Sequence, residues 1–236
     1  MIFNTLITTL LFALFTLTHA REVPANVREF YDKVKGGECP VAVAKGFSQG
    51  AYSGESNYCV DKDHTVMWIT TPSGLADMDI DCDGANQGYG KCANDPTGQG
   101  MTSFVGDVVK HGLSDLDSNT HSFVVLGNHG FDPQSLGIKP LSLVAVICGG
   151  QLFYAIWGDS NATDKVGEAS ISLANACFGD SMTGNSGHNQ HDVLYLAFPG
   201  EDADASKTCN WGAKSFAEFE DSLGPLGDKL VAGIHA

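Results

Sequence analysis

Two apolar runs separated by two glycines constrain the fold of this chain more than any other feature of its sequence. Residues 143–148 and 152–157 flank Gly149 and Gly150, which is the pattern of two β-strands joined by a tight hairpin turn. Gly-rich loops separate this hairpin from further β-type runs at residues 65–70, 123–126 and 193–198. The pattern predicts a mainly β protein, a barrel or a sandwich, rather than a parallel α/β sheet.

The hairpin is followed by two carboxyl groups at the ends of predicted elements. Asp159 ends the second strand, and Glu168 precedes residues 169–178, a segment of small and apolar residues with Gly179 as a helix C-cap. We therefore predict that Asp159 leaves a rigid strand and that Glu168 lies near a helix start. Both are candidates for catalysis.

Helical patterns lie at the two ends of the β region. Residues 24–35 have the spacing of a short amphipathic helix, and residues 102–112 fit either a strand or a short helix. A tail at about 212–236 follows a helical period that is interrupted at Gly224-Pro225. We expect this tail to pack outside a β core of about residues 39–200.

The first twenty residues indicate export from the cell. They contain no charged side chain, and residues 6–17 form an apolar centre before the small-residue cleavage pattern Thr18-His19-Ala20. The apolar stretch is too short to span a membrane, and no other segment is suitable. We predict a signal peptide at 1–20 and a single secreted catalytic domain at 21–236.

Seven cysteines in an exported chain predict disulfides with one thiol left over. Cys82 and Cys92 are near enough in sequence to close a short loop, and the apolar surroundings of Cys148 suggest that it is the buried free thiol. The remaining cysteines are Cys39, Cys59, Cys177 and Cys209. Their spacing does not resemble a zinc site.

The formal net charge of −15, from 28 acidic and 13 basic residues, argues against nucleic acid as a partner, since nucleic acid requires a basic surface. Four of the acids form the run Asp77, Asp79, Asp81 and Asp83. In an extended chain all four lie on one face, where they repel one another unless a cation offsets the charge. Three explanations remain open: a positively charged substrate, calcium, or a structural role in capping turns.

Calcium has partial support, because Asp79-x-Asp81-x-Asp83-Gly84 matches the start of an EF-hand loop. The twelfth position of that loop is Gly90 rather than Glu, however. His188 and His191 do not form a convincing metal site, since no third ligand has a clear spacing. No Gly-x-Ser-x-Gly elbow is present.

Paired carboxylates such as Asp159 and Glu168 suggest glycoside hydrolysis, in which one carboxyl group protonates the leaving oxygen and the other activates water or attacks carbon. Tyr154 and Trp157 lie close by in sequence and are candidate faces for sugar stacking, although the pattern fits a core position for Trp157 equally well. Asn161 begins the sequon Asn161-Ala162-Thr163. A glycan there would crowd the site, so either this side chain points away from it or the sequon is unused.

Several long motifs occur in the same order as in a known family: ADMDIDCDG at 76–84, KPLS at 139–142, YAIWGD at 154–159, GEASISLA at 167–174 and HDVLY at 191–195. Over roughly residues 41–200 the chain resembles the fungal chitosanases of glycoside hydrolase family 75. The resemblance implies a secreted endo-acting enzyme that cleaves β-1,4-linked glucosamine polymers with inversion. It also implies that Asp159 and Glu168 are the two essential carboxylates. The loop at 160–166 departs from the family pattern, which leaves the geometry between these two residues open.

The strand, hairpin and Gly-Asp ending also look like the six-stranded double-psi β-barrel of some lytic transglycosylases and endoglucanases, which is an analogy of fold alone. If Glu168 lies at a helix start, the helix dipole favours its ionised form, which suits a general base. A dry setting beside Trp157 would raise the pKa of Asp159, which suits a general acid. The substrate expected for an acidic cleft is chitosan, a polycation. We expect a monomer without a cofactor or a catalytic metal. The alternatives are another secreted β-1,4-glycan hydrolase and a non-catalytic wall-binding protein.

Overall fold

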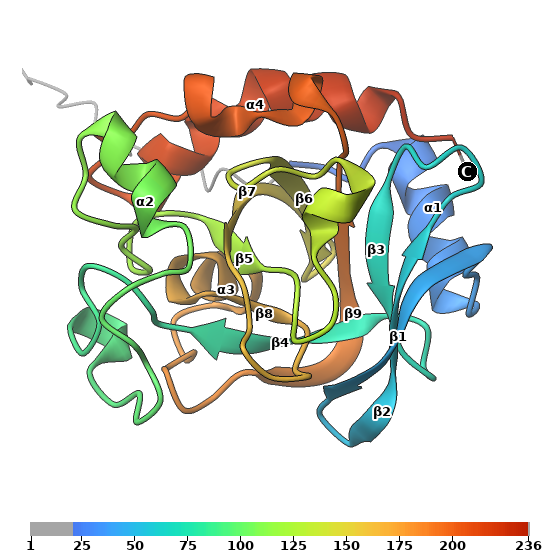
Figure 1. The fold of residues 1–236 in the computed structure, drawn as a ribbon, viewed down its shortest axis with the longest axis horizontal. Helices are drawn as coiled ribbons and strands as arrows, with labels where there is room; N and C mark the ends of the chain where they lie inside the picture. The colour runs from blue at the N-terminus through green and yellow to red at the C-terminus, as the bar shows by residue number, and fades with distance from the viewer. Residues whose placement is uncertain (1–20, 236) are drawn as a thin grey trace, which may run out of the picture.

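The computed structural model describes residues 21–235, and most of its strands pair into a closed ring (Figure 1). The strands are β1 (Val41–Gln49), β2 (Tyr52–Val60), β3 (Met67–Thr70), β4 (Ala76–Asp81), β5 (Phe123–Val125), β6 (Leu143–Cys148), β7 (Gln151–Asp159), β8 (Glu168–Ser170) and β9 (His188–Ala197). Their order is β1-β2-β3-β9-β4-β8-β5-β7-β6, and β6 also pairs with β9. The ring therefore runs β9-β4-β8-β5-β7-β6 and back to β9. The predicted signal peptide, residues 1–20, lies outside the described residues.

The predicted hairpin is confirmed as β6 and β7. The two strands pair antiparallel from Leu143 opposite Ile156 to Cys148 opposite Gln151. Gly149 and Gly150 connect them with φ angles of 55° and 77°, a left-handed conformation that costs glycine little. Most other pairs are also antiparallel, but β4 with β8 and β5 with β7 run parallel.

The strands of the hairpin are apolar without alternation because both faces of this part of the sheet are covered. In β6, Val144 and Val146 belong to one buried cluster with Trp157. Leu143 and Ala145, which point the opposite way, pack in a second cluster with side chains of two helices. A strand buried on both faces reads as a continuous apolar run.

Within residues 21–235, four α-helices accompany the sheet: α1 (Ala25–Lys35), α2 (Val105–Val108), α3 (Ile171–Phe178) and α4 (Phe216–Ala232). Short 3₁₀ turns lie at Gly90–Cys92, Val109–His111, Pro133–Leu136, Glu201–Ala203 and Ala205–Lys207. The helix predicted at 24–35 is confirmed, and the ambiguous segment at 102–112 contains α2. Figure 1 shows α4 lying along the outside of the ring, over β6 and β7. No helix in the described part of the chain has the length and apolar character needed to cross a membrane.

The expected interruption at Gly224-Pro225 does not break the C-terminal helix, since α4 contains Pro225. Glycines let this helix approach the sheet closely. A Cβ atom on Gly227 would lie 2.5 Å from the Tyr154 ring, and one on Gly224 would lie 3.0 Å from the Arg21 guanidinium. The small residues that weaken the helical pattern in the sequence are thus required for packing.

Three disulfides form within the described residues: Cys39–Cys59, Cys82–Cys92 and Cys148–Cys177. The predicted Cys82–Cys92 loop is confirmed. The expectation that Cys148 is the free thiol is wrong, and Cys209 is free instead. Cys148 precedes Gly149, whose missing Cβ would lie 2.3 Å from the Cys177 carbonyl oxygen, so the turn brings β6 close to the end of α3.

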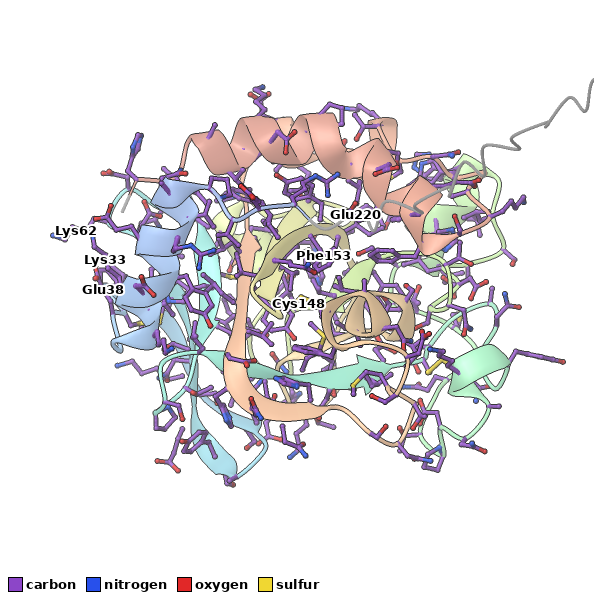
Figure 2. All side chains as sticks on the ribbon, turned by 180° about the vertical axis from the view of Figure 1, so that it is seen from behind. Lys33, Glu38, Lys62, Cys148, Phe153 and Glu220 are labelled. Carbon is purple, nitrogen blue, oxygen red and sulfur yellow. A yellow bond between two sulfur atoms is a disulfide. The ribbon has the colours of Figure 1, made fainter. Side chains whose placement is uncertain are left out.

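Arg21 joins the start of the described chain to β7 and α4. Its backbone exchanges hydrogen bonds with Leu152, its guanidinium lies 4.6 Å from the centre of the Tyr154 ring, and it forms an ion pair with Glu220. Glu220 is fully buried and also accepts a hydrogen bond from the Tyr154 backbone N–H at 2.8 Å. Figure 2 shows Glu220 on the side of α4 that faces the sheet.

Arg21→Ala is expected to lower the free energy of unfolding by about 3–5 kcal/mol, because it leaves the Glu220 carboxyl buried without its charged partner. Chemical denaturation of the purified protein measures the change. The control is Arg28→Ala on the exposed face of α1, for which we expect a change within about 0.5 kcal/mol. Equal stability of the Arg21→Ala and wild-type proteins would contradict this role.

Candidate active site

Asp159 and Glu168 lie on either side of one residue of the short strand β5. Val125 pairs with Asp159 of β7 in the parallel direction and with Glu168 of β8 in the antiparallel direction. Because neighbouring strands are ~4.8 Å apart, the Cα atoms of the two acidic residues are about 10 Å apart. Glu168 also pairs with Asp79 of β4. Residues from four strands therefore form one row across the sheet.

A cleft of about 610 Å³ opens over this row. Its acidic lining residues are Asp81, Asp83, Asp95, Asp159 and Glu168. One carboxylate oxygen from each of Asp81, Asp83 and Asp159 lies within 4.8 Å of the others. Lys165 also lines the cleft, and none of the described residues that line it is aromatic. Such a surface attracts cations.

Asp159 is held rigidly at the floor of the cleft. It is 3% exposed, and its Oδ1 accepts hydrogen bonds from the backbone N–H groups of Ser103 at 2.8 Å and Ser160 at 2.7 Å. Its carbonyl oxygen accepts a bond from Trp157 Nε1 at 2.8 Å. Burial raises the pKa of Asp159, and the hydrogen bonds from Ser103 and Ser160 oppose that rise by favouring the ionised form.

Glu168 has a different environment. Burial raises its pKa to about 7, and the nearby charges of Asp79 and Asp159 add to the rise. The opposing contact is the hydrogen bond that Asn161 Nδ2 donates to Glu168 Oε2 at 2.7 Å. The expected effect of a helix dipole is wrong, because Glu168 lies on β8 and α3 begins only at Ile171. Burial, rather than a helix dipole, has the largest effect on the pKa of Glu168.

The aspartate run is divided between the cleft and the protein interior. β4 is extended as far as Asp81, so the predicted alternation holds for Asp77, Asp79 and Asp81. Asp77 is 1% exposed and its Oδ1 has no hydrogen-bond partner. Burial raises the pKa of Asp77 to about 7. Asp79 is half-buried, and burial also raises the pKa of this carboxyl group. Neither Asp77 nor Asp79 lines the cleft.

Asp81 and Asp83 are the members of the run that reach the cleft. Burial and the charge of Asp159 raise the pKa of Asp81 well above its ordinary value, and burial raises that of Asp83 to about 6. Asp81 Oδ1 accepts from the Asp83 N–H at 2.7 Å, and Asp83 Oδ1 accepts from the Gln99 N–H at 2.5 Å. These residues thus combine turn capping with negative charge at the cleft surface.

The prediction that Tyr154 and Trp157 stack on sugars is wrong. Both side chains are buried, at 0% and 1% exposure, because β7 is covered on both faces. Tyr154 packs beneath α4 and its hydroxyl donates to Asp228 at 2.8 Å. Trp157 Nε1 donates hydrogen bonds to the carbonyl oxygens of Leu126 and Asp159 and so stabilises the backbone at the floor of the cleft.

Ser103, Val125 and Lys165 are cleft residues that sequence reasoning missed. Ser103 and Val125 carry no chemical signature in the sequence, and only the strand pairing places them beside the carboxylates. Asn161 drew attention as a sequon, yet its amide points at Glu168. Neither His188 nor His191 lines the cleft. His188 Nε2 forms a hydrogen bond with Asp192 Oδ1 at 2.8 Å, and its ring stacks on Phe178.

Comparison with known proteins identifies the family of this chain. Residues 78–233 match the family model described as fungal chitosanase of glycosyl hydrolase group 75. The chain belongs to this family. The matched segment contains every strand of the ring except the first residues of β4, together with both candidate catalytic residues.

Similarity to individual members of group 75 extends over nearly the whole chain. An endo-chitosanase of Aspergillus fumigatus is 51% identical over 95% of this chain and 96% of its own length. Endo-chitosanase B of Aspergillus oryzae is 46% identical with the same coverage. Endo-chitosanase C of Aspergillus oryzae is 36% identical over 68% of this chain and 39% of its own length. The family resemblance seen in the sequence is confirmed.

The raised pKa values in and beside the cleft predict that the protein is more stable in mild acid than at neutral pH. Asp77, Asp83 and Glu168 bind protons more tightly in the folded chain than in the unfolded one. Their contribution is therefore present near pH 4 and is lost as the pH rises through about 6 to 7. We expect Tm to fall by more than ~4 °C between pH 5 and pH 8, measured by calorimetry in constant ionic strength.

Asp77→Asn is the matched variant for this experiment, since it keeps the shape of the buried side chain and removes its titration. We expect a shallower decline of Tm with pH in this variant. A wild-type protein whose Tm rises between pH 5 and pH 8 would rule out the buried acids as the dominant titrating groups.

Proposed function

We propose that this protein is a secreted endo-acting chitosanase that hydrolyses β-1,4 linkages between glucosamine units with inversion of the anomeric carbon. The observation that carries the proposal is the placement of Asp159 and Glu168 on either side of Val125 in an acidic cleft. Membership of group 75 and relatives called endo-chitosanases support it. Residues 21–236 are proposed as the catalytic domain that remains after removal of the signal peptide at 1–20.

The spacing of the two carboxyl groups suits inversion. An inverting enzyme places a water molecule between the basic carboxylate and the sugar, which requires carboxyl groups about 6.5–9.5 Å apart. Two strand spacings separate the Cα atoms of Asp159 and Glu168 by about 10 Å. Side chains that extend from the same face over the cleft then remain within the inverting range rather than the shorter distance of about 5–5.5 Å used for covalent catalysis.

The environments of the carboxyl groups assign Glu168 as the general acid and Asp159 as the general base. Glu168, with a pKa of about 7, retains a proton in mildly acidic medium and can give it to the leaving oxygen. Asp159 accepts two backbone N–H bonds that favour its ionised form, as a base requires. This assignment reverses the one expected from the sequence, in which a helix dipole acted on Glu168.

The substrate follows from the charge of the cleft. Chitosan carries ammonium groups in mild acid, and Asp81 and Asp83 offer carboxylate oxygens close to Asp159. A neutral β-1,4-glucan would leave this negative charge without compensation. Because no aromatic residue lines the cleft, recognition by charge takes the place of ring stacking. Calcium is a second possible occupant, but it takes 6–8 oxygen ligands, and Gly90 supplies no side chain at the twelfth position of the loop.

The fold that we propose is a six-stranded double-psi β-barrel with β1, β2 and β3 attached to it. Support comes from the closed pairing of six strands and from the two parallel pairs, β4 with β8 and β5 with β7, within a mostly antiparallel ring. In this arrangement Asp159 ends β7 and Glu168 begins β8, so the two proposed catalytic residues lie at the two ends of the loop that joins these strands.

Glu168→Gln is expected to lower kcat on soluble chitosan by at least ~10³-fold while leaving Tm within a few degrees, because an amide cannot donate the acid's proton to the leaving oxygen. Release of reducing ends measures the rate. The same assay on cellulose and chitin separates a chitosanase from a glucanase, and a wall-binding protein would release no ends from any polymer. Undiminished cleavage of chitosan by Glu168→Gln would refute the assignment.

A glucosaminide with an activated leaving group distinguishes the general acid from the general base, because this leaving group departs with little protonation. We expect Glu168→Gln to recover much of its loss on this substrate and to lack the alkaline limb of the pH–rate profile. Asp159→Asn is expected to remain impaired on both substrates. The opposite pattern would make Asp159 the acid.

Asp83→Asn is expected to raise KM severalfold for fully deacetylated chitosan and less for a partly acetylated polymer. The reason is that the Asp83 carboxylate attracts ammonium groups, and acetylated sugar units carry none. Added salt should reduce the difference between variant and wild type. The control is Asp63→Asn, an exposed acid in the turn between β2 and β3. Equal changes for both polymers would indicate a structural role for Asp83 as the cap of the Gln99 N–H.

A further inference from the structure

The side chain of Asn161 is oriented by contacts on both of its amide atoms. Its Oδ1 accepts hydrogen bonds from the Thr163 N–H at 2.8 Å and from Thr163 Oγ1 at 2.7 Å. Since both partners in these bonds act as donors, the oxygen must face Thr163 and the NH₂ group must face Glu168. The bond from Nδ2 to Glu168 Oε2 therefore follows from the network around the residue.

The loop that carries Asn161 is fastened to the sheet independently of this side chain. The Asn161 N–H donates to the Gly127 carbonyl oxygen at 3.1 Å. Ser160 Oγ donates to the Leu126 carbonyl oxygen at 3.0 Å, and the Ser160 N–H donates to Asp159 Oδ1. Removing the amide of Asn161 thus removes its contact to Glu168 and its two hydrogen bonds from Thr163, while the bonds from Ser160 and from the Asn161 N–H still hold the start of the loop on the sheet.

We propose that Asn161 is a positioning residue that holds the reacting carboxyl group of Glu168 in place, and that its sequon is unglycosylated in the active enzyme. The inference rests on the proposed role of Glu168. An N-glycan is attached through the same nitrogen that donates to Glu168. Attachment would leave a single N–H on that atom and would place the first sugar within the cleft that Asn161, Ala162 and Thr163 line.

Glycosylation and catalysis therefore compete for one nitrogen atom. The sequence left two alternatives for the sequon: a side chain that points away from the site, or a sequon that is unused. The hydrogen bond to Glu168 excludes the first for the described conformation. A chain that received a glycan at Asn161 before folding would carry the sugar where the substrate must bind.

The role of Asn161 is tested by kinetics of Asn161→Ala and Asn161→Asp produced without glycosylation in a bacterial host that forms disulfides. We expect kcat to fall roughly 10- to 100-fold with KM changed less than about threefold, since a hydrogen bond to an ionisable group at the reacting centre is lost. The Asn161 amide favours the ionised form of Glu168. Its loss should therefore move the alkaline limb of the pH–rate profile upward by about one unit, and Asp should move it further by repulsion.

The matched control is Asp164→Asn on the exposed side of the same loop, for which kcat and the pH limb should stay at wild-type values. A merely structural role for Asn161 would lower Tm and leave the pH limb unmoved, which would overturn the inference. Glu168→Gln, assayed in parallel, separates the two failures. If Glu168→Gln stays active, the proposed function fails. If it is inactive while Asn161→Ala matches wild type, the positioning role fails.

The state of the sequon is tested on wild-type enzyme from a fungal host. Mass spectrometry of the peptide that contains Asn161 should find the residue unmodified in the active fraction. Any glycosylated fraction, separated on a lectin column, should have at least ~100-fold lower specific activity, because the sugar occupies the cleft. A fully glycosylated enzyme with the kcat of the bacterial product would overturn this part of the proposal.

Discussion

The site depends on the backbone hydrogen bonds that hold β5 between β7 and β8. This strand has three residues, yet Val125 sets the separation of Asp159 and Glu168 because each of them pairs with it. Trp157 reinforces the arrangement by donating its indole N–H to the carbonyl oxygens of Leu126, next to Val125, and of Asp159. A separation set by strand pairing varies little, whereas one set by a flexible loop would vary by ångströms. The proposed inverting mechanism needs a fixed separation, since the attacking water must fit between the base and the sugar.

Hydrogen bonding gives two buried and chemically similar carboxyl groups the different roles that we propose for them. Both lose solvent, which raises the pKa of each. The backbone N–H groups of Ser103 and Ser160 then stabilise the charge on Asp159, while a single side-chain amide from Asn161 faces Glu168. The difference in hydrogen-bond donors, rather than the difference between Asp and Glu, separates an acid from a base in this cleft.

Local patterns in the sequence were sufficient for the elements that repeat a simple period. The hairpin at Gly149-Gly150, the helix near residues 24–35, the strand position of Asp159 and the part of β9 from Val193 onward all follow from such patterns. Patterns do not say which face of a strand another element covers, so Tyr154 and Trp157 were both candidates for sugar stacking, and a core position was considered for Trp157 alone, although α4 and the ring enclose both. The start of α3 was close enough to Glu168 to suggest a helix dipole, but Glu168 belongs to β8, and the rest of that strand, Ala169 and Ser170, separates it from the helix. Cys148 and Cys177 meet only because the turn at Gly149 touches the end of α3.

The aspartate run shows how one sequence pattern acquires several functions through burial alone. Asp77, Asp79 and Asp81 share a face of β4, but only Asp81 reaches the cleft, and Asp83 extends beyond the strand to cap the Gln99 N–H. Asp77 lies beneath Gly50 and Gly167 and, with a pKa of about 7, holds a proton in the mild acid in which chitosan is charged. A protonated Asp77 does not repel Asp79, and Asp83, with a pKa of about 6, is ionised at a lower pH than Asp77. As the pH rises, negative charge therefore develops on Asp83 at the cleft surface before it develops on Asp77 in the interior.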